Sequence, residues 1–176
     1  LLKAKGNELG FENLLSKGDK ELFIAGEQYS WIRWNPYKGG MTTISEDGIE
    51  SEPFYRGDVD IKILGPDRAF HQLNKSRWED VDDISIIEFV HIDEIKADYP
   101  HVGDDLVLGN SSVFETLLRR ENYDQNYKMV VHYFRRPTRF LTTGAYYKYC
   151  YDAILEGGNK YPYRDNLLPV VYDTDI

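Results

Sequence analysis

The sequence predicts an α+β fold built mostly from antiparallel sheets and hairpins, with an N-terminal helix and two short helices. Three observations lead to this class. Helical and strand-like segments do not alternate regularly, as they would in a parallel βαβ protein. Several segments alternate apolar and polar residues, which is typical of half-buried strands. The chain also carries 14 tyrosines, 3 tryptophans and 8 phenylalanines, and aromatic side chains favour pleated surfaces and interfaces.

The first predicted element is a helix over residues 8–25. Asn7 is a suitable N-cap, because its side-chain oxygen can accept a hydrogen bond from a backbone N–H of the first turn. Gly26 is a suitable end, and Gly18 inside the helix indicates the close approach of another element. The apolar stripe recurs near the helical period and consists of Leu9, Phe11, Leu14, Leu15, Leu22 and Phe23.

Strands and turns follow the helix. Residues 29–34 and 41–44 are expected to pair as a hairpin across a Pro- and Gly-containing turn at residues 35–40, with a second turn at 45–48. Residues 153–155 either extend the strand before them or pair separately. The other predicted strands are residues 59–64, 69–73, 84–91, 128–134, 140–151 and 168–172.

Two short helices complete the prediction. Residues 93–99 form the first, which Pro100 closes. Residues 112–121 form the second, because Ser112 and Glu115 have the spacing of a capping box. We expect one segment of 176 residues, with the first helix in 1–27, mixed strands and a short helix in 28–111, and a short helix followed by antiparallel strands in 112–176.

Charge and composition narrow the function. The net charge of −9 argues against a protein that wraps DNA tightly, because such proteins carry a basic face. The single Cys150 cannot form an internal disulfide, and no apolar run approaches the ~20 residues of a membrane span. The chain starts at Leu1 directly ahead of a helical pattern and ends abruptly, so we expect a piece of a longer polypeptide.

The common enzyme motifs are absent, including phosphate-binding glycine loops, the nucleophile elbow and the zinc-binding helix. His91 with Asp93 and Glu94 could be read as a metal site, but these carboxylates also suit the first turn of a helix. Cys150 with His132 could be read as a thiol–imidazole pair, but a lone cysteine more commonly packs as a small apolar residue. We therefore predict no catalytic residue, no metal and no cofactor.

An acidic run around Val81 comprises Glu79, Asp80, Asp82 and Asp83. Clustered carboxylates can bind Mg²⁺ and support phosphodiester cleavage, which leaves a metal-dependent nuclease or hydrolase as a lesser alternative. Such a site needs further ligands from other strands. We favour a solvated acidic loop.

The main basic cluster comprises Arg135, Arg136 and Arg139, with Arg119 and Arg120 earlier in the chain. It could contact DNA phosphate or an acidic neighbouring subunit, or it could be a charged hairpin tip that keeps a sheet edge soluble. Given the negative net charge, we favour a subunit contact or the hairpin tip over DNA.

Five sequence phrases, taken in order, resemble the portal proteins of tailed bacteriophages and prophages. They are a helix ending near Gly26 before a strand that closes on Asn35-Pro36, the strand 59–64 ending in Gly65-Pro66, the strand 84–91 after the acidic run, the helix ending in Tyr99-Pro100, and the passage from Phe134 through Arg136-Pro137 to Leu168-Pro169. The resemblance spans about residues 8–172 and is closest to the wing region. The chain lacks the long stem helices and the clip of a complete portal subunit, and it has His71-Gln72 where many portals have Asp-Pro.

The resemblance implies a structural subunit of a ring, typically a dodecamer, at one vertex of the capsid. It implies localisation in the virion, and in the host cytoplasm during assembly. The implied partners are further copies of the chain, the terminase large subunit, a head–tail adaptor, capsid or scaffolding protein, and DNA passing through the channel during packaging and ejection, with no membrane. Another phage structural module, from a tail or baseplate, is the main alternative.

Overall fold

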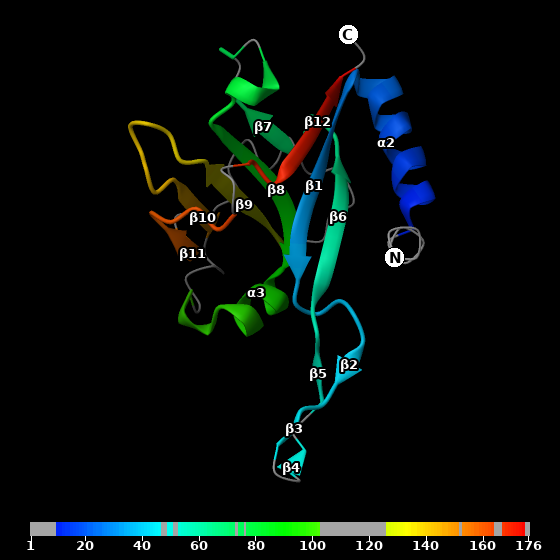
Figure 1. The fold of residues 1–176 in the computed structure, drawn as a ribbon, viewed down its shortest axis with the longest axis vertical. Coiled ribbons are helices and arrows are strands. Elements are labelled where there is room, and N and C mark those ends of the chain that lie inside the picture. The colour runs from blue at the N-terminus through cyan, green and yellow to red at the C-terminus, as the bar shows by residue number, and fades with distance from the viewer. Residues whose placement is uncertain are drawn as a thin grey trace. The chain divides into compact units, whose positions relative to one another are not determined.

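A computed structural model describes residues 10–46, 49–50, 53–72, 74–75, 77–102, 126–151, 153–163 and 167–174, with the backbone alone at residues 45–46 and 49–50. The fold is α+β with antiparallel sheets, as predicted (Figure 1). The chain divides into two compact units. The first unit comprises Leu1–Gly65 with Pro169–Ile176, and the second comprises Pro66–Leu168.

The first unit contains helix α2 (Phe11–Ala25) and a sheet of three antiparallel strands in the order β12 (Val170–Thr174), β1 (Glu27–Asn35) and β6 (Asp58–Leu64). Figure 1 shows β1 and β12 side by side, although they come from opposite ends of the chain. Tyr29 lies opposite Tyr172 on one side and opposite Leu64 on the other. The alternation in β1 therefore gives this sheet two distinct faces.

One face of the sheet buries Tyr29 and Trp31, which are 1% and 2% exposed. The other face carries Ser30 and Ile32 and packs against α2. The helix approaches closely at Gly18, because a Cβ atom there would collide with the side-chain oxygen of Gln28 on β1. This confirms the prediction that Gly18 marks the close approach of another element.

The predicted helix start and the predicted hairpin of the first unit were wrong. Helix α2 begins at Phe11, with Gly10 in the left-handed conformation at its N-cap, rather than at residue 8; Asn7 lies outside the described residues. Residues 41–44 do not pair with 29–34. The nine residues of β1 pair with the longer strands β6 and β12, which offer hydrogen bonds over most of its length.

The segment between β1 and β6 instead forms two short ribbons. Strand β2 (Met41–Thr42) pairs with β5 (Phe54–Tyr55), and β3 (Ser45–Glu46) pairs with β4 (Ile49–Glu50). Residues 45–46 are thus strand rather than turn. Figure 1 shows these ribbons beyond the end of β1.

The second unit contains a sheet of five antiparallel strands in the order β11 (Ala153–Gly158), β10 (Ala145–Cys150), β9 (Tyr127–Arg135), β8 (Asp83–His91) and β7 (Ala69–His71). A 3-10 turn, η1 (Trp78–Asp80), precedes β8, and helix α3 (Ile92–Asp98) follows it. One sheet face carries Ile84, Ile86, Phe134 and Val130, all at most 2% exposed. These side chains form much of the core of this unit.

Strands 84–91 and 128–134 and the helix before Pro100 are confirmed within a residue or two. The prediction of a strand over residues 140–151 was wrong at its start, because residues 140–144 form a turn. The N–H of Thr138 and the carbonyl of Leu141 are 2.9 Å apart in this turn, and Gly144 has a φ of 62°. Residues 153–155 belong to a separate strand, β11, paired with β10.

The predicted helix 112–121, with Ser112, Glu115, Arg119 and Arg120, lies outside the described residues. Within the described part of the chain, no helix is long and apolar enough to cross a membrane.

Candidate interaction surface

The basic cluster lies where β9 ends and the turn to β10 begins. Arg135 is the last residue of β9 and is exposed, while Arg136 and Arg139 lie in the turn. The Arg139 guanidinium lies 4.5 Å from the centre of the Phe140 ring, and Phe140 is 84% exposed. The tip of the turn thus presents an arginine stacked on an exposed aromatic ring, a combination that is enriched in protein interfaces.

Arg136 has internal partners. Its Nε donates to Asp82 Oδ1 at 3.3 Å, and its Nη2 donates to the backbone carbonyl of Glu79. The backbone N–H of Arg136 also donates to the carbonyl of Asp82 at 2.9 Å. Arg136 therefore holds the turn against the segment before β8. Arg135 and Arg139 are the exposed, outward-facing members of the cluster, although the charge of Arg135 also acts on Asp83 and Tyr133.

The structure thus brings together the acidic run and the basic cluster. Asp83 lies opposite Arg135 in the β8–β9 register, and Asp82 also lies 3.5 Å from Lys75 Nζ. Burial raises the pKa of Asp83, although the charge of Arg135 acts in the opposite direction. The carboxylates of Asp82 and Asp83 are therefore held by cations and by the Gln72 amide, which donates to Asp83 Oδ2 at 2.8 Å.

His91 serves as the N-cap of α3. Its Nδ1 accepts a hydrogen bond from the backbone N–H of Asp93 at 3.3 Å, which satisfies a donor of the first turn. Asp93 and Glu94 lie in that first turn, where the helix dipole favours carboxylates, as predicted. Among the described residues, no group of three or more His, Cys, Asp and Glu side chains could hold a metal ion.

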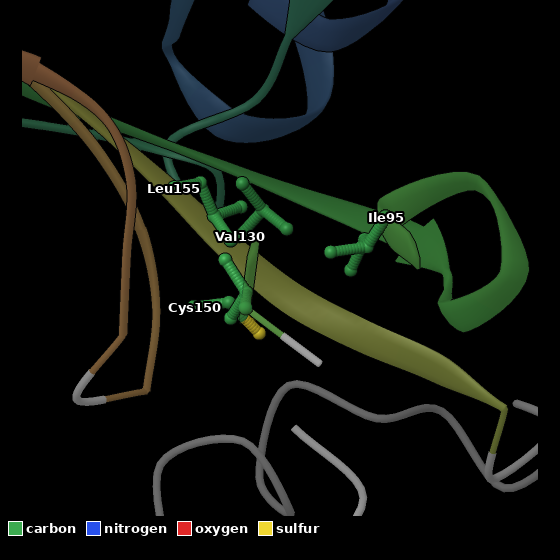
Figure 2. Packing of buried hydrophobic residues seen from close by; sticks show 5 residues of the cluster. Ile95, Val130, Cys150 and Leu155 are labelled. Atoms are coloured by element: carbon green, nitrogen blue, oxygen red, sulfur yellow. The ribbon is translucent and has the colours of Figure 1, made fainter. Parts of the chain in front are cut away.

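Cys150 and His132 lie on neighbouring strands but in different surroundings. Cys150 is fully buried in an apolar cluster with Ile95 of α3, Val130 and Leu155 (Figure 2). His132 Nε2 lies 3.0 Å from Glu88 Oε2, and both side chains are at most 10% exposed. The burial of both groups gives a thiol–imidazole pair no access to a substrate.

The buried Glu88–His132 pair was missed by the sequence reasoning, as was a neighbouring polar chain. Lys148 Nζ donates to the Tyr99 hydroxyl at 3.2 Å, and that hydroxyl donates to Glu156 Oε2 at 3.2 Å. The only sequence signal is a charged residue at an inward position of a strand. Which residues meet depends on the register between strands, which the sequence alone did not supply.

A cavity of about 230 Å³ lies in the first unit, between α2 and the sheet. Phe11, Leu14 and Leu15 line it from the helix, and Ile32 and Val171 are among the apolar residues that line it from the sheet. Leu15 is 52% exposed and Val171 57%, so apolar surface continues from the cavity onto its rim.

Two polar residues of β1, Gln28 and Ser30, also line the cavity. The Gln28 Oε1 atom is buried beside Gly18 and has no hydrogen-bond partner among the described residues. The cavity is otherwise apolar, and such a cavity is suited to an apolar group rather than to water.

Comparison with known proteins gives no assignment. No protein-family model matches the chain. No curated protein matches it either.

Proposed function

We propose that this chain is a structural, non-catalytic component of a phage portal, belonging to the wing region of a ring-forming subunit. The observation that carries the proposal is the order of the five portal-like phrases in the sequence. In the structure, several of these phrases fall at the ends of strands. Asn35 ends β1, Leu64 ends β6, Arg135 ends β9 and Val170 begins β12.

The described chemistry is compatible with this role. The residues that sequence reasoning weighed for metal binding or catalysis hold a helix cap, an ion pair or an apolar cluster. Their polar groups stabilise local structure, and Cys150 is closed off from solvent. Exposed aromatic side chains such as Phe140 and Trp34 are available for contacts between subunits.

Within this proposal, the outward-facing arginines at the β9–β10 turn contact a neighbouring subunit. In the assembled virion the ring would sit at a capsid vertex, with DNA passing through its channel. The terminase, the adaptor, and the capsid or scaffolding protein would dock on other surfaces of the ring.

Electron microscopy of the complete gene product that carries this chain tests the proposal. We expect closed rings with a uniform number of subunits, and plasmid DNA that stays uncut when it is incubated with the product and Mg²⁺. A gene product that stays monomeric under assembly conditions would refute the portal assignment. DNA cleavage that disappears in Asp82→Asn would instead establish the nuclease alternative.

A further inference from the structure

The Phe140 turn and the cavity beneath α2 have complementary chemistry. The turn presents a phenyl ring that is 84% exposed, and the cavity is a hollow of about 230 Å³ with mainly aliphatic walls. An apolar cavity of about 150 Å³ is large enough to bind benzene. The volume is therefore sufficient for one phenyl ring.

The turn is built to present this ring. The backbone N–H of Phe140 donates to Thr138 Oγ1 at 3.3 Å, and that of Leu141 donates to the same oxygen at 3.1 Å. The N–H of Tyr161 donates to the carbonyl of Thr143 at 3.0 Å and fixes the far side of the turn. Phe140 thus projects from an ordered loop, which lowers the entropy cost of burying it in a partner.

Charge at the two surfaces is also complementary. Arg139 is exposed and lies over the phenyl ring, and Arg135 is exposed at the end of β9. Around the cavity, Glu12 follows the lining residue Phe11, and Asp173 lies on the same sheet face as the lining residue Val171. Asp19 also follows Gly18, while Lys17 and Lys20 are the nearby cations, so three carboxylates stand against two ammonium groups. The cavity rim is thus more acidic than basic, and the turn is basic, so the two surfaces attract.

We infer that Phe140 of one copy of this chain inserts into the cavity beneath α2 of a second copy, with Arg135 and Arg139 against the acidic rim. This inference rests on the proposed function, since it names the subunit contact of the basic turn. The contact joins two different surfaces and is therefore head-to-tail. Repeated around an axis, such a contact closes a ring if the rotation between copies closes and otherwise extends a filament, and the ring is the form that the proposed function requires.

The test uses one variant of the turn and two of the cavity. Phe140→Ala removes the ring from an exposed turn position. Ser30→Leu fills the cavity from the middle of β1, and Val171→Phe fills it from β12. Phe23→Ala is the matched control, because Phe23 is 88% exposed but lies in neither surface. Urea denaturation of each variant verifies that it is folded.

Sedimentation of the 176-residue chain then measures self-association. Burying a phenylalanine side chain corresponds to about a 10- to 100-fold change in dissociation constant, so Phe140→Ala and Ser30→Leu are each expected to weaken self-association by about that factor. Phe23→Ala is expected to associate like the wild type. Equal association of Phe140→Ala and wild type overturns the inference, as does a wild-type chain that never self-associates.

Mixing the two variants gives the sharpest result. The Ser30→Leu chain keeps its phenylalanine, and the Phe140→Ala chain keeps its cavity, so one contact can form between them. That pair cannot extend, because the surfaces it leaves unused are both defective. We expect one-to-one heterodimers from the mixture and no larger species. A mixture that stays monomeric overturns the inference.

The outcomes separate the two proposals. If the complete gene product forms rings that Phe140→Ala does not weaken, the Phe140 contact is wrong and the portal assignment stands. If the chain self-associates through Phe140 but the gene product forms no ring, the contact is right and the portal assignment is wrong.

Discussion

Gly144 permits the tight turn between β9 and β10, and replacing it should destabilise the second unit strongly. Its φ of 62° lies in the left-handed region, where a residue with a Cβ atom pays about 1–2 kcal/mol. A Cβ atom there would also lie 2.7 Å from the carbonyl oxygen of Arg135 and 2.8 Å from Tyr161 Cβ. Backbone and core atoms must shift to relieve such contacts, which costs about another 1–3 kcal/mol.

We therefore expect Gly144→Ala to lower the free energy of unfolding by about 3 kcal/mol, obtained by adding the conformational and steric contributions. The matched control is Gly158→Ala in the same sheet, because a Cβ atom there meets no heavy atom within 4 Å. Its effect should stay within about 0.5 kcal/mol. Urea denaturation followed by circular dichroism measures both.

The reasoning is refuted if Gly144→Ala and Gly158→Ala have the same midpoint of denaturation. Such a result would mean that the turn relaxes without cost, and that neither the backbone conformation nor the contact with Arg135 constrains it. A large loss in both variants would instead point to a general need for glycine in this sheet.

Three further predictions concern buried and paired charges. Burial raises the pKa of Asp83 above its ordinary value of 3.8. The contribution of Asp83 to stability is therefore present below pH 3.8 and is lost as the pH rises through the folded pKa. Relative to wild type, Asp83→Asn should gain stability as the pH rises, measured by urea midpoints across a pH series. Asp60 should show the opposite sign, because burial would raise its pKa but Lys38 holds that pKa below 3.8. The contribution of Asp60 to stability is therefore present above pH 3.8 and is lost on acidification. Asp60→Asn should remove this acid-sensitive part of the free energy of unfolding. If a variant's stability has the same pH dependence as that of wild type, the pKa direction given for the substituted residue is wrong. Glu88→Ala should lower the free energy of unfolding by about 3 kcal/mol in the same assay, because it leaves His132 buried without its carboxylate partner. A loss below about 1 kcal/mol, which is typical of an exposed pair, would show that the pair is not held in a dry site.

Much of the secondary structure could be predicted because it depends on local patterns. Alternation placed β6, β8 and β9 within a residue or two, and the proline at position 100 placed the end of α3. The α+β class followed from the order of these segments. The prediction failed at residues 41–44 and 140–144, where turn geometry and the length of the partner strand decide the structure.

The candidate surface was only half visible in the sequence. The arginines at 135, 136 and 139 stood out as a cluster, but nothing local indicated that Arg136 pairs with Asp82 while Arg139 stacks on Phe140. The cavity beneath α2 also had no sequence signal, because its walls come from four separate elements, α2, β1, β6 and β12.

Residue type and local spacing predicted most of the helices and strands, and they show that the chain is acidic, aromatic and without common catalytic motifs. These properties follow from residue type and from spacing over a few residues. The folded chain was needed to show that β12 completes the sheet beside β1, with Glu27 opposite Thr174, and that the acidic run meets the basic turn. Such pairings depend on the register between strands that are distant in sequence. A local pattern is compatible with several registers, and only the packing of the whole chain selects one of them.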